Sequence, residues 1–341
     1  MVLRGAISGF GEVAAQAHLA GWRSRPGISI VAIHDPVAPR RHHAINLIRN
    51  IRVYDDLQLM LDGEALDFID IASPPALHAE AAALALEAGA NVLVEKPLCL
   101  DPGDFNKLAA IAERNRRVLM CVHNWKHSPA YLRAYELVKS GRLGRVGYLS
   151  LVRMRNRPAG ANASAERWRL EAKTGGGILI DHGWHTFYLA QWLMGDEQPV
   201  SVSAILGSYP YSEVEDLADM RIEFQGGRIA YVHLSWRSPV RRTAATLCGS
   251  SAILEIEGDR LTLIPRQGPG EDHSVIDAPD DSYHAGWFAG IAADFESALK
   301  AAPERELMRA NLREAEAALA LMNAARESAV HGGQPIRVHG P

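Results

Sequence analysis

Residues 4–14 read Arg4-Gly5-Ala6-Ile7-Ser8-Gly9-Phe10-Gly11-Glu12-Val13-Ala14, and the fold class can be inferred from them. The short apolar run at its start predicts a β-strand, and the glycines predict a tight loop that opens a helix. G-x-G-x-x-G/A spacing in that position is typical of a loop that binds the pyrophosphate of a dinucleotide. Gly9 permits the turn, Gly11 lets phosphates approach the backbone, and Ala14 is small enough for helix–strand packing.

An acidic residue lies where such a loop needs one. Asp35 ends a second predicted strand, about 20 residues beyond the loop, where a carboxylate binds ribose hydroxyls. The Asp35 carboxylate would also repel the extra phosphate of NADP, so NAD is the predicted cofactor. Arg40 and Arg41 follow closely and could attract that phosphate, so NADP is the less favoured alternative. A glycine turn beside an ordinary surface aspartate is the alternative. The predicted cofactor contacts here are Gly9, Phe10, Gly11, Glu12, Val13, Asp35 and Arg40.

Strand and helix signals alternate along the first third of the chain, which implies a parallel sheet with helical crossovers. The predicted strands are 4–8, 28–34, 67–72, 91–94 and 117–122, and helices are predicted over 76–88 and from Asp101-Pro102 to about Asn115. We therefore predict an α/β fold with an N-terminal Rossmann domain, a doubly wound parallel sheet, over residues 1–122.

The pattern changes after residue 122. A helix over about 129–140 is followed by strand signals at 148–157, 218–224, 228–236, 243–247, 252–257 and 260–264. Gly-rich turns between several of these strands favour hairpins, hence an antiparallel sheet. We predict an α+β domain over 123–341, with a large, mostly antiparallel open sheet. Two closing helices, about 284–301 and 304–328, can pack back on the first domain.

Composition narrows the classes of protein. The 341 residues are 48% hydrophobic and 22% charged, with a formal net charge of −4, which favours a soluble globular protein and argues against a nucleic-acid partner. The three cysteines show no metal-like or disulfide spacing. No apolar run is long enough for a membrane span, and the N-terminus does not resemble a signal peptide. We expect a cytoplasmic protein.

A lysine follows the fourth predicted strand, in Glu95-Lys96-Pro97. The carboxyl ends of parallel strands line the ligand crevice of a doubly wound sheet, so Lys96 is placed to donate a hydrogen bond to a substrate hydroxyl and stabilise a developing alkoxide. A solvated lysine at a strand end is the alternative. Ser73-Pro74-Pro75 follows the third predicted strand, where the prolines fix the loop beside the cofactor or merely end the strand.

A glycine run introduces the second unusual stretch, Gly175-Gly176-Gly177-Ile178-Leu179-Ile180-Asp181-His182-Gly183-Trp184-His185. Asp181 and His185 are four residues apart and would share one face of a helix. Histidine is the usual general base near neutral pH, and a neighbouring carboxylate can orient it. A helix-capping aspartate with a packed core histidine is the alternative. The pair could also bind a metal, but no convincing third ligand follows, so no metal site is predicted.

Taken together, these motifs resemble the Gfo/Idh/MocA family of oxidoreductases, which includes inositol dehydrogenases and many sugar dehydrogenases. The resemblance spans nearly the whole chain. It rests on the glycine loop, Ser73-Pro74-Pro75 with His78, Glu95-Lys96-Pro97, the D-x-G-x-H pattern at Asp181–His185, Glu215-Asp216 and the closing helix that ends in Glu327-Ser328-Ala329.

The resemblance implies an oxidoreductase that transfers a hydride between NAD and a hydroxyl carbon of a sugar, sugar acid or cyclitol. Lys96, Asp181 and His185 would be the catalytic residues. The same resemblance implies a homodimer or homotetramer formed through the C-terminal sheet. It extends the cofactor contacts to Ser73, Pro74, Pro75, His78, Glu95, Lys96 and Pro97.

Two features set the substrate pocket apart from the family pattern. Asn124-Trp125-Lys126-His127 stands where many relatives carry an arginine followed by phenylalanine. Arg153, Arg155 and Arg157 would share one strand face, followed by Arg167, Trp168 and Arg169. This set favours either a pocket for an anionic sugar or a solvated or interface face of the sheet, and we favour the second because runs of charge are usually exposed. The predicted substrate contacts are Lys96, Asn124, Trp125, Lys126, Arg155, Trp168, Arg169, Asp181 and His185.

Two other functions are compatible with the same fold. A tightly bound and recycled NAD could serve elimination or glycoside cleavage, and net NADH formation from a simple polyol would separate this reaction from dehydrogenation. A non-catalytic NAD(H) sensor is the second. The joint presence of Lys96, Asp181 and His185 argues against a sensor.

Overall fold

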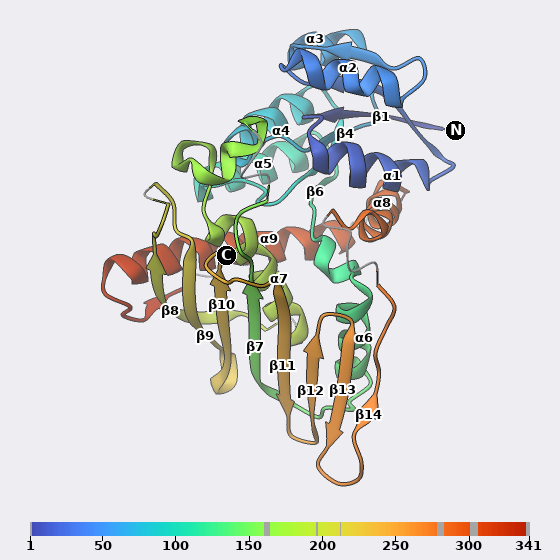
Figure 1. The fold of residues 1–341 in the computed structure, drawn as a ribbon. Coiled ribbons are helices and arrows are strands. Elements are labelled where there is room, and N and C mark those ends of the chain that lie inside the picture. Colours follow the sequence, from blue (N-terminus) through green and yellow to red (C-terminus); the bar gives the residue numbers. More distant parts are fainter. Residues whose placement is uncertain are drawn as a thin grey trace. The chain divides into compact units, whose positions relative to one another are not determined.

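The computed structural model describes residues 2–159, 164–195, 197–211, 213–277, 283–300 and 306–338. The chain forms two compact units, each with its own sheet (Figure 1). The first comprises Met1–His127 and Asp280–Ala315, and the second Ser128–Pro279 and Glu316–Pro341.

Six parallel strands form the sheet of the first unit, in the order β3-β2-β1-β4-β5-β6. This order places β1 and β4 at the centre, so their carboxyl ends flank the point where the strand order reverses. The strands are β1 (Leu3–Ser8), β2 (Ile28–His34), β3 (Arg52–Tyr54), β4 (Phe68–Ile71), β5 (Asn91–Val94) and β6 (Leu119–Cys121).

Helices α1 to α5 lie between these strands in the sequence, and α8 joins them from much later in the chain. They are α1 (Leu19–Arg23), α2 (Ala38–Leu47), α3 (Leu57–Gly63), α4 (His78–Glu87), α5 (Pro102–Arg114) and α8 (Ala285–Lys300). Helix α4 packs against α5, and α1 packs against α8. The α1–α8 contact is aromatic, with Trp22 beside Phe288 and Phe295 at ring distances of 5.6 and 6.0 Å. Helix α8 therefore covers the first unit although it comes late in the sequence.

The sheet of the second unit has nine strands in the order β14-β13-β12-β11-β7-β10-β9-β8-β15. Only the β7–β10 pair is parallel among the strand pairs of this described sheet. The strands are β7 (Val146–Met154), β8 (Pro199–Gly207), β9 (Leu217–Phe224), β10 (Arg228–Ser235), β11 (Arg242–Gly249), β12 (Ala252–Glu257), β13 (Arg260–Pro265), β14 (Glu271–Asp272) and β15 (Ile336–Arg337).

Alternate residues of this sheet are buried, so it has one core face and one open face. In β12, for example, Ala252, Leu254 and Ile256 are buried while the residues between them are exposed. The helices are α6 (Pro129–Lys139), α7 (Trp184–Leu193) and α9 (Glu306–Val330), whose first residues, to Ala315, belong to the first unit. All ten residues of α7 are buried, which makes it the central helix of the second unit's core.

The predicted fold class is confirmed, with corrections in detail. Strand β3 was not predicted because it has only three residues, none of them fully buried. The strand predicted over 148–157 ends at Met154, so Arg157 is not on it, and Arg157 is exposed. Residue 301 and residues 304–305, at the ends of the two predicted closing helices, lie outside the described residues.

Candidate active site

The glycine loop between β1 and the first helix is pressed against the loop that follows β4. Gly9 has φ +88°, and a Cβ atom there would lie 2.6 Å from the Ser73 nitrogen and 2.8 Å from the Ala72 carbonyl carbon. Both atoms are backbone and cannot move aside cheaply, so the position requires glycine. Around Gly11 the space is open, and the nearest atom to a Cβ is the Arg40 guanidinium carbon at 4.0 Å.

Asp35 joins the glycine loop to the end of β2. Its carboxylate is buried and accepts hydrogen bonds from the Phe10 and Val37 N–H groups, both at 2.8 Å. The Arg40 guanidinium lies 3.5 Å from the same carboxylate, and Arg41 donates to the Asp35 carbonyl at 2.7 Å. Asp35 therefore fixes the loop through a main-chain contact, in addition to the ribose contact that its position predicts.

The other predicted cofactor residues divide into exposed and buried groups. The Glu12 side chain is exposed, Val13 is half-buried, and the Phe10 ring is buried in the core. The Ser73 hydroxyl is buried and has no hydrogen-bond partner among the described residues. The open space at Gly11 and the unsatisfied Ser73 hydroxyl, on the loop against which Gly9 packs, fit a polar ligand such as a dinucleotide, since buried polar atoms ordinarily have partners.

His78 ties two loops of the predicted site together. Its ring is fully buried and contacts the Ser73 carbonyl at 2.7 Å and the Pro97 carbonyl at 2.6 Å. Burial lowers the pKa of His78, although both carbonyl contacts oppose the change. Its side chain thus holds the Ser73-Pro74-Pro75 and Glu95-Lys96-Pro97 loops in place.

A buried charge cluster lies behind Lys96. Glu95 accepts from the Lys96 N–H at 2.9 Å through one oxygen and contacts His18 Nε2 at 3.1 Å through the other. His18 Nδ1 contacts Asp70 at 2.9 Å, and Trp22 donates to the same Asp70 oxygen at 2.7 Å. Burial opposes a charge on His18, but Asp70 and Glu95 outweigh it and raise its pKa to about 9. The loop that carries Lys96 is therefore anchored to a cationic histidine.

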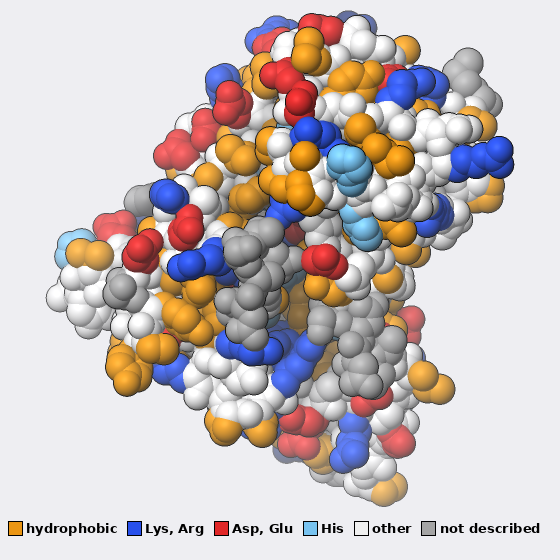
Figure 2. Space-filling view, turned by 45° about the horizontal axis from the view of Figure 1, so that its top comes forward, with side chains coloured by type: hydrophobic (Ala, Val, Ile, Leu, Met, Phe, Trp, Pro, Cys, Tyr) orange, Lys and Arg blue, Asp and Glu red, His pale blue; other side chains and the backbone are white. Residues whose placement is uncertain are grey.

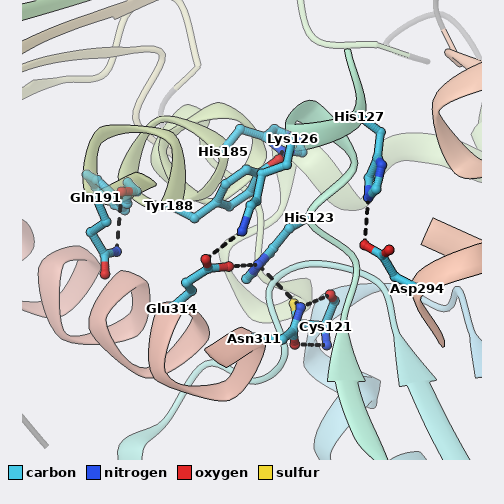
Figure 3. Close-up of polar contacts among 11 residues, drawn as sticks. Cys121, His123, Lys126, His127, His185, Tyr188, Gln191, Asp294, Asn311 and Glu314 are labelled. Carbon is cyan, nitrogen blue, oxygen red and sulfur yellow. Dashed lines mark hydrogen bonds and ion pairs between the residues drawn. The ribbon is translucent and has the colours of Figure 1, made fainter. Parts of the chain in front are cut away.

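The segment after β6 is also held by polar contacts, which Figure 3 shows. Lys126 Nζ lies 2.5 Å from Glu314, and His123 Nδ1 contacts the other oxygen of that carboxylate at 3.1 Å. Trp125 packs edge-on against His284 and Trp287. The Asn124 side-chain oxygen is buried and lacks a partner among the described residues. Among these predicted substrate contacts, Asn124 has a buried oxygen that could accept a hydrogen bond from a ligand. Trp125 and Lys126 contact other residues of the first unit.

In the second unit, the glycine run lets the chain pass close to its neighbours. A Cβ on Gly176 would lie 2.6 Å from the Arg169 carbonyl oxygen, and one on Gly177 would collide with the Glu215 carboxylate. Glu215 in turn accepts from the Leu179 N–H at 3.3 Å, and burial raises its pKa. A π-helical turn, Leu179–Gly183, then leads into α7. Asp181 lies inside this turn, so it does not cap the helix.

Asp181 and Arg169 are brought together. The Arg169 Nε–Asp181 Oδ1 distance is 3.2 Å, and both side chains are largely buried, at 12% and 7% exposure. The Arg169 guanidinium also stacks 4.3 Å from the Trp168 ring centroid. Three of the predicted substrate contacts therefore form one continuous group.

His185 begins the next helical turn. Its Nδ1 lies 2.9 Å from the Tyr188 hydroxyl, three residues further along α7 (Figure 3). The predicted i, i+4 face is thus built from a π-helical turn and an α-helical turn rather than from one regular helix. Tyr188 was not identified from the sequence, although its helical spacing from His185 could have indicated it.

The interpretation of the arginines as a solvated face is wrong for Arg153. Arg153 lies on the core face of β7 with 1% exposure, where its guanidinium donates to the Tyr131 hydroxyl and lies 5.3 Å from the Tyr131 ring centroid. Arg155 is part-buried. The alternation of apolar and basic residues suggested a polar outer face, but here the basic residue at position 153 points into the core.

Neither a membrane span nor a metal site is found in the part of the chain that the structure describes. No described helix is both long and apolar enough to cross a bilayer. The described residues also contain no group of three or more His, Cys, Asp or Glu side chains arranged to hold a metal ion.

Comparison with known proteins identifies the family. Residues 3–123 match the model described as oxidoreductase family, NAD-binding Rossmann fold, and residues 131–255 match the GFO/IDH/MocA C-terminal domain. The chain is 27% identical to D-glucoside 3-dehydrogenase of Escherichia coli K12 over 78% of this chain and 82% of that protein. It is 28% identical to D-apiose dehydrogenase of Paraburkholderia graminis over 78% of this chain and 70% of that protein.

A solved structure shows the same fold. An inositol dehydrogenase homologue from Azotobacter vinelandii, complexed with NAD+, aligns with a TM-score of 0.86 at 20% identity, over 99% of this chain and 97% of that one. The first family model covers the whole six-stranded sheet, and the second covers strands β7 to β11 of the nine-stranded sheet. The chain belongs to the GFO/IDH/MocA family of NAD-binding oxidoreductases.

Proposed function

We propose that this protein is an NAD-dependent dehydrogenase that oxidises one hydroxyl carbon of a sugar, sugar acid or cyclitol. The observation that carries the proposal is the cradle at the glycine loop, where Gly9 packs on Ser73 and Gly11 leaves room for phosphate. The names of the relatives support it, since D-glucoside, D-apiose and inositol dehydrogenases all act on hydroxyl carbons. Dehydrogenation is therefore favoured over cofactor recycling and over a sensor.

NAD would be held by the glycine loop, Asp35 and the Ser73 loop, and when bound it accepts the hydride. The residues of the chain must then remove the hydroxyl proton, because a hydroxyl carbon cannot lose hydride while its oxygen keeps the proton. We assign this role to His185. Its Nδ1 faces the Tyr188 hydroxyl, so the proton would be taken at Nε2.

Lys96 and Asp181 have supporting roles in this proposal. Lys96 Nζ would donate a hydrogen bond to the reacting oxygen, and such a charge-assisted bond strengthens as negative charge develops there. Asp181 would accept hydrogen bonds from substrate hydroxyls while Arg169 holds its orientation at 3.2 Å. The Glu95–His18 contact would keep the Lys96 backbone in place.

We further propose that the protein works in the cytoplasm as a homodimer or homotetramer. The open face of the nine-stranded sheet supports association, because Tyr148, Ile253 and Ile264 expose 37–39% of their surface there. Apolar side chains that remain exposed together on a sheet are typical of an interface.

The first test is NADH formation at 340 nm with NAD and with NADP, against neutral sugars, uronic acids and inositols. We expect turnover with NAD. Lys96→Ala and His185→Ala should each lower kcat by about 100-fold or more, while NAD binding, followed by fluorescence, persists. The exposed residues Lys107 and His42 supply matched controls, since Lys107→Ala and His42→Ala remove the same groups from the surface. Variants of Lys96 and His185 that stay within tenfold of the wild type would contradict the assigned roles.

A further inference from the structure

Four arginines of the second unit are linked through Asp181 and Arg155: Arg169 contacts Asp181, and the charges of Asp181, Arg153 and Arg241 all act on Arg155. We call Arg153, Arg155, Arg169 and Arg241 the arginine cluster. Arg153 is buried near the end of β7. Arg155 follows directly after that strand and stays beside β10, because its backbone N–H donates to the Ser235 carbonyl at 2.8 Å. Arg169 contacts Asp181, which lies 12 residues further along the chain. Figure 2 shows that Lys and Arg side chains also gather near the middle of the face presented there.

The hydrogen bonds of Arg155 go to neutral acceptors. Its guanidinium donates to the Met154 carbonyl at 2.8 Å, the Arg242 carbonyl at 3.1 Å and the Thr243 hydroxyl at 3.2 Å. Within the described part of the chain, no carboxylate lies in ion-pair distance of it. A part-buried cation thus has polar contacts but no opposite charge of its own.

Two arginines on strands of the same sheet, and Arg237 just after β10, are paired with carboxylates. The described partners are Glu223 for Arg221 at 2.6 Å, Asp216 for Arg237 at 2.6 Å and Glu257 for Arg242 at 3.0 Å. Each of these three arginines thus has a carboxylate within ion-pair distance. Arg155 departs from this pattern although it is less exposed than Arg242.

The electrostatic surroundings of Arg155 disfavour its charge. Burial and then the charges of Arg241 and Arg153 lower its pKa from 12.5 to about 9, and Asp181 only partly opposes them. Asp181 is itself in contact with Arg169. A buried cation without a matched anion is costly, and an anionic ligand at this place would remove the cost.

We propose that the arginine cluster binds the carboxylate or phosphate group of the substrate, so that the preferred substrate is an acidic sugar or cyclitol. This inference rests on the proposed dehydrogenase function and narrows its substrate class. Carboxylate and phosphate share the oxyanion geometry that a guanidinium binds with two parallel hydrogen bonds. The anion would contact Arg155, where the positive charges of Arg153 and Arg241 also favour it, and Asp181 would accept bonds from the hydroxyls.

Direct binding to the NAD-loaded protein tests the inference without requiring turnover. The probes are D-glucose, D-glucuronate, D-glucose 6-phosphate, myo-inositol and inositol 1-phosphate, with dissociation constants measured by calorimetry. We expect at least one acidic probe to bind about 10- to 100-fold more tightly than its neutral counterpart, as charge-assisted hydrogen bonds imply. The carboxylate and phosphate arms then show which anion the site takes.

Variants connect that preference to Arg155. Arg155→Gln should bring the acidic-to-neutral affinity ratio close to one, and Arg155→Lys should keep part of it, because lysine retains the charge but not the planar fork. Arg221→Gln is the matched control, since it removes a paired arginine of the same sheet and should leave the ratio unchanged. Thermal unfolding checks that each variant is folded.

The outcomes separate the two proposals. NADH formation from neutral probes, with no tighter binding of any acidic probe, would overturn the arginine-cluster inference and leave the dehydrogenase proposal standing. Tight acidic binding that Arg155→Gln abolishes, with no NADH from any probe, would support the cluster and overturn the dehydrogenase proposal. An affinity ratio that Arg155→Gln and Arg155→Lys leave unchanged would also overturn the inference.

Discussion

At the scale of single residues, Gly9 and Gly11 belong to one motif but have different physical requirements. Gly9 is needed by the protein itself, because its φ is +88° and the backbone of Ser73 lies 2.6 Å from a Cβ position. Gly11 has space around it, so its requirement comes from the ligand. The G-x-G spacing thus contains one glycine that the fold requires and one that ligand binding requires.

Alanine substitutions should separate these constraints. Gly9→Ala should lower the free energy of unfolding by about 2 kcal/mol or more, from the left-handed conformation and the backbone collision together. Gly11→Ala should leave stability within about 0.5 kcal/mol and weaken NAD binding at least tenfold. Urea unfolding without NAD and fluorescence titration with NAD measure the two effects. Equal stability losses in both variants would contradict the distinction.

His18 gives stability a defined pH dependence. Its pKa in the folded protein, about 9, exceeds the ordinary value of 6.5, so the folded state binds this proton more tightly than the unfolded state. Its stabilising contribution is therefore complete below pH 6.5 and is lost as the pH rises through 9. We expect the free energy of unfolding to fall between pH 6.5 and 9 in the wild type, and less steeply in His18→Gln. Parallel pH profiles would show that His18 is not the group responsible.

At the scale of elements, a side chain completes the edge of the parallel sheet. Asn311, on the first part of α9, accepts from the Cys121 N–H at 2.7 Å and donates to the Cys121 carbonyl at 2.9 Å. Strand β6 is the last strand in the sheet order, so its outer backbone groups would otherwise need other partners. A single amide thus satisfies both of these groups of an edge strand (Figure 3).

Replacing that amide should be costly. Asn311→Ala leaves one N–H and one carbonyl unsatisfied in a buried place, and each is worth about 1–3 kcal/mol, so we expect a loss of about 2–4 kcal/mol. Arg313→Ala is the control on the same helix, because its ion pair with Glu306 is exposed and such pairs contribute about 0–1 kcal/mol. Chemical denaturation of both variants measures the difference, and similar losses would refute the edge-strand explanation.

Elements with strong periodicity were predictable, and contacts between distant segments were not. Strands β2 and β5 and the 252–257 strand have the bounds expected from their apolar runs. The tie between Asn311 and Cys121 could not be foreseen, since 190 residues separate them. The contacts of His18 were not predicted for the same reason, because its partners Asp70 and Glu95 lie 52 and 77 residues away in the sequence. Arg153 was misjudged because the sequence pattern does not reveal which face of β7 is buried.

At the scale of the whole molecule, one face of the nine-stranded sheet carries apolar side chains that are exposed among the described residues. Tyr148, Cys248, Ile253 and Ile264 are paired in register across β7, β11, β12 and β13, so their side chains form one row on that face. Tyr231 adds a ring 5.9 Å from Tyr148. A row of this kind suits association with a second copy of the sheet.

Charges in this row should therefore prevent assembly. The wild type is expected to run as a dimer or tetramer of the 37.2 kDa chain in size-exclusion chromatography with light scattering. The double variant Ile253→Asp/Ile264→Asp should run as a folded monomer, because two buried carboxylates without partners cost more than an interface of ordinary size supplies at these positions. Ile276→Asp is the control, since that side chain is 96% exposed and outside the described strands. A wild-type protein that runs as a monomer would contradict the interface altogether. An oligomer that persists in the double variant would show that the interface lies elsewhere.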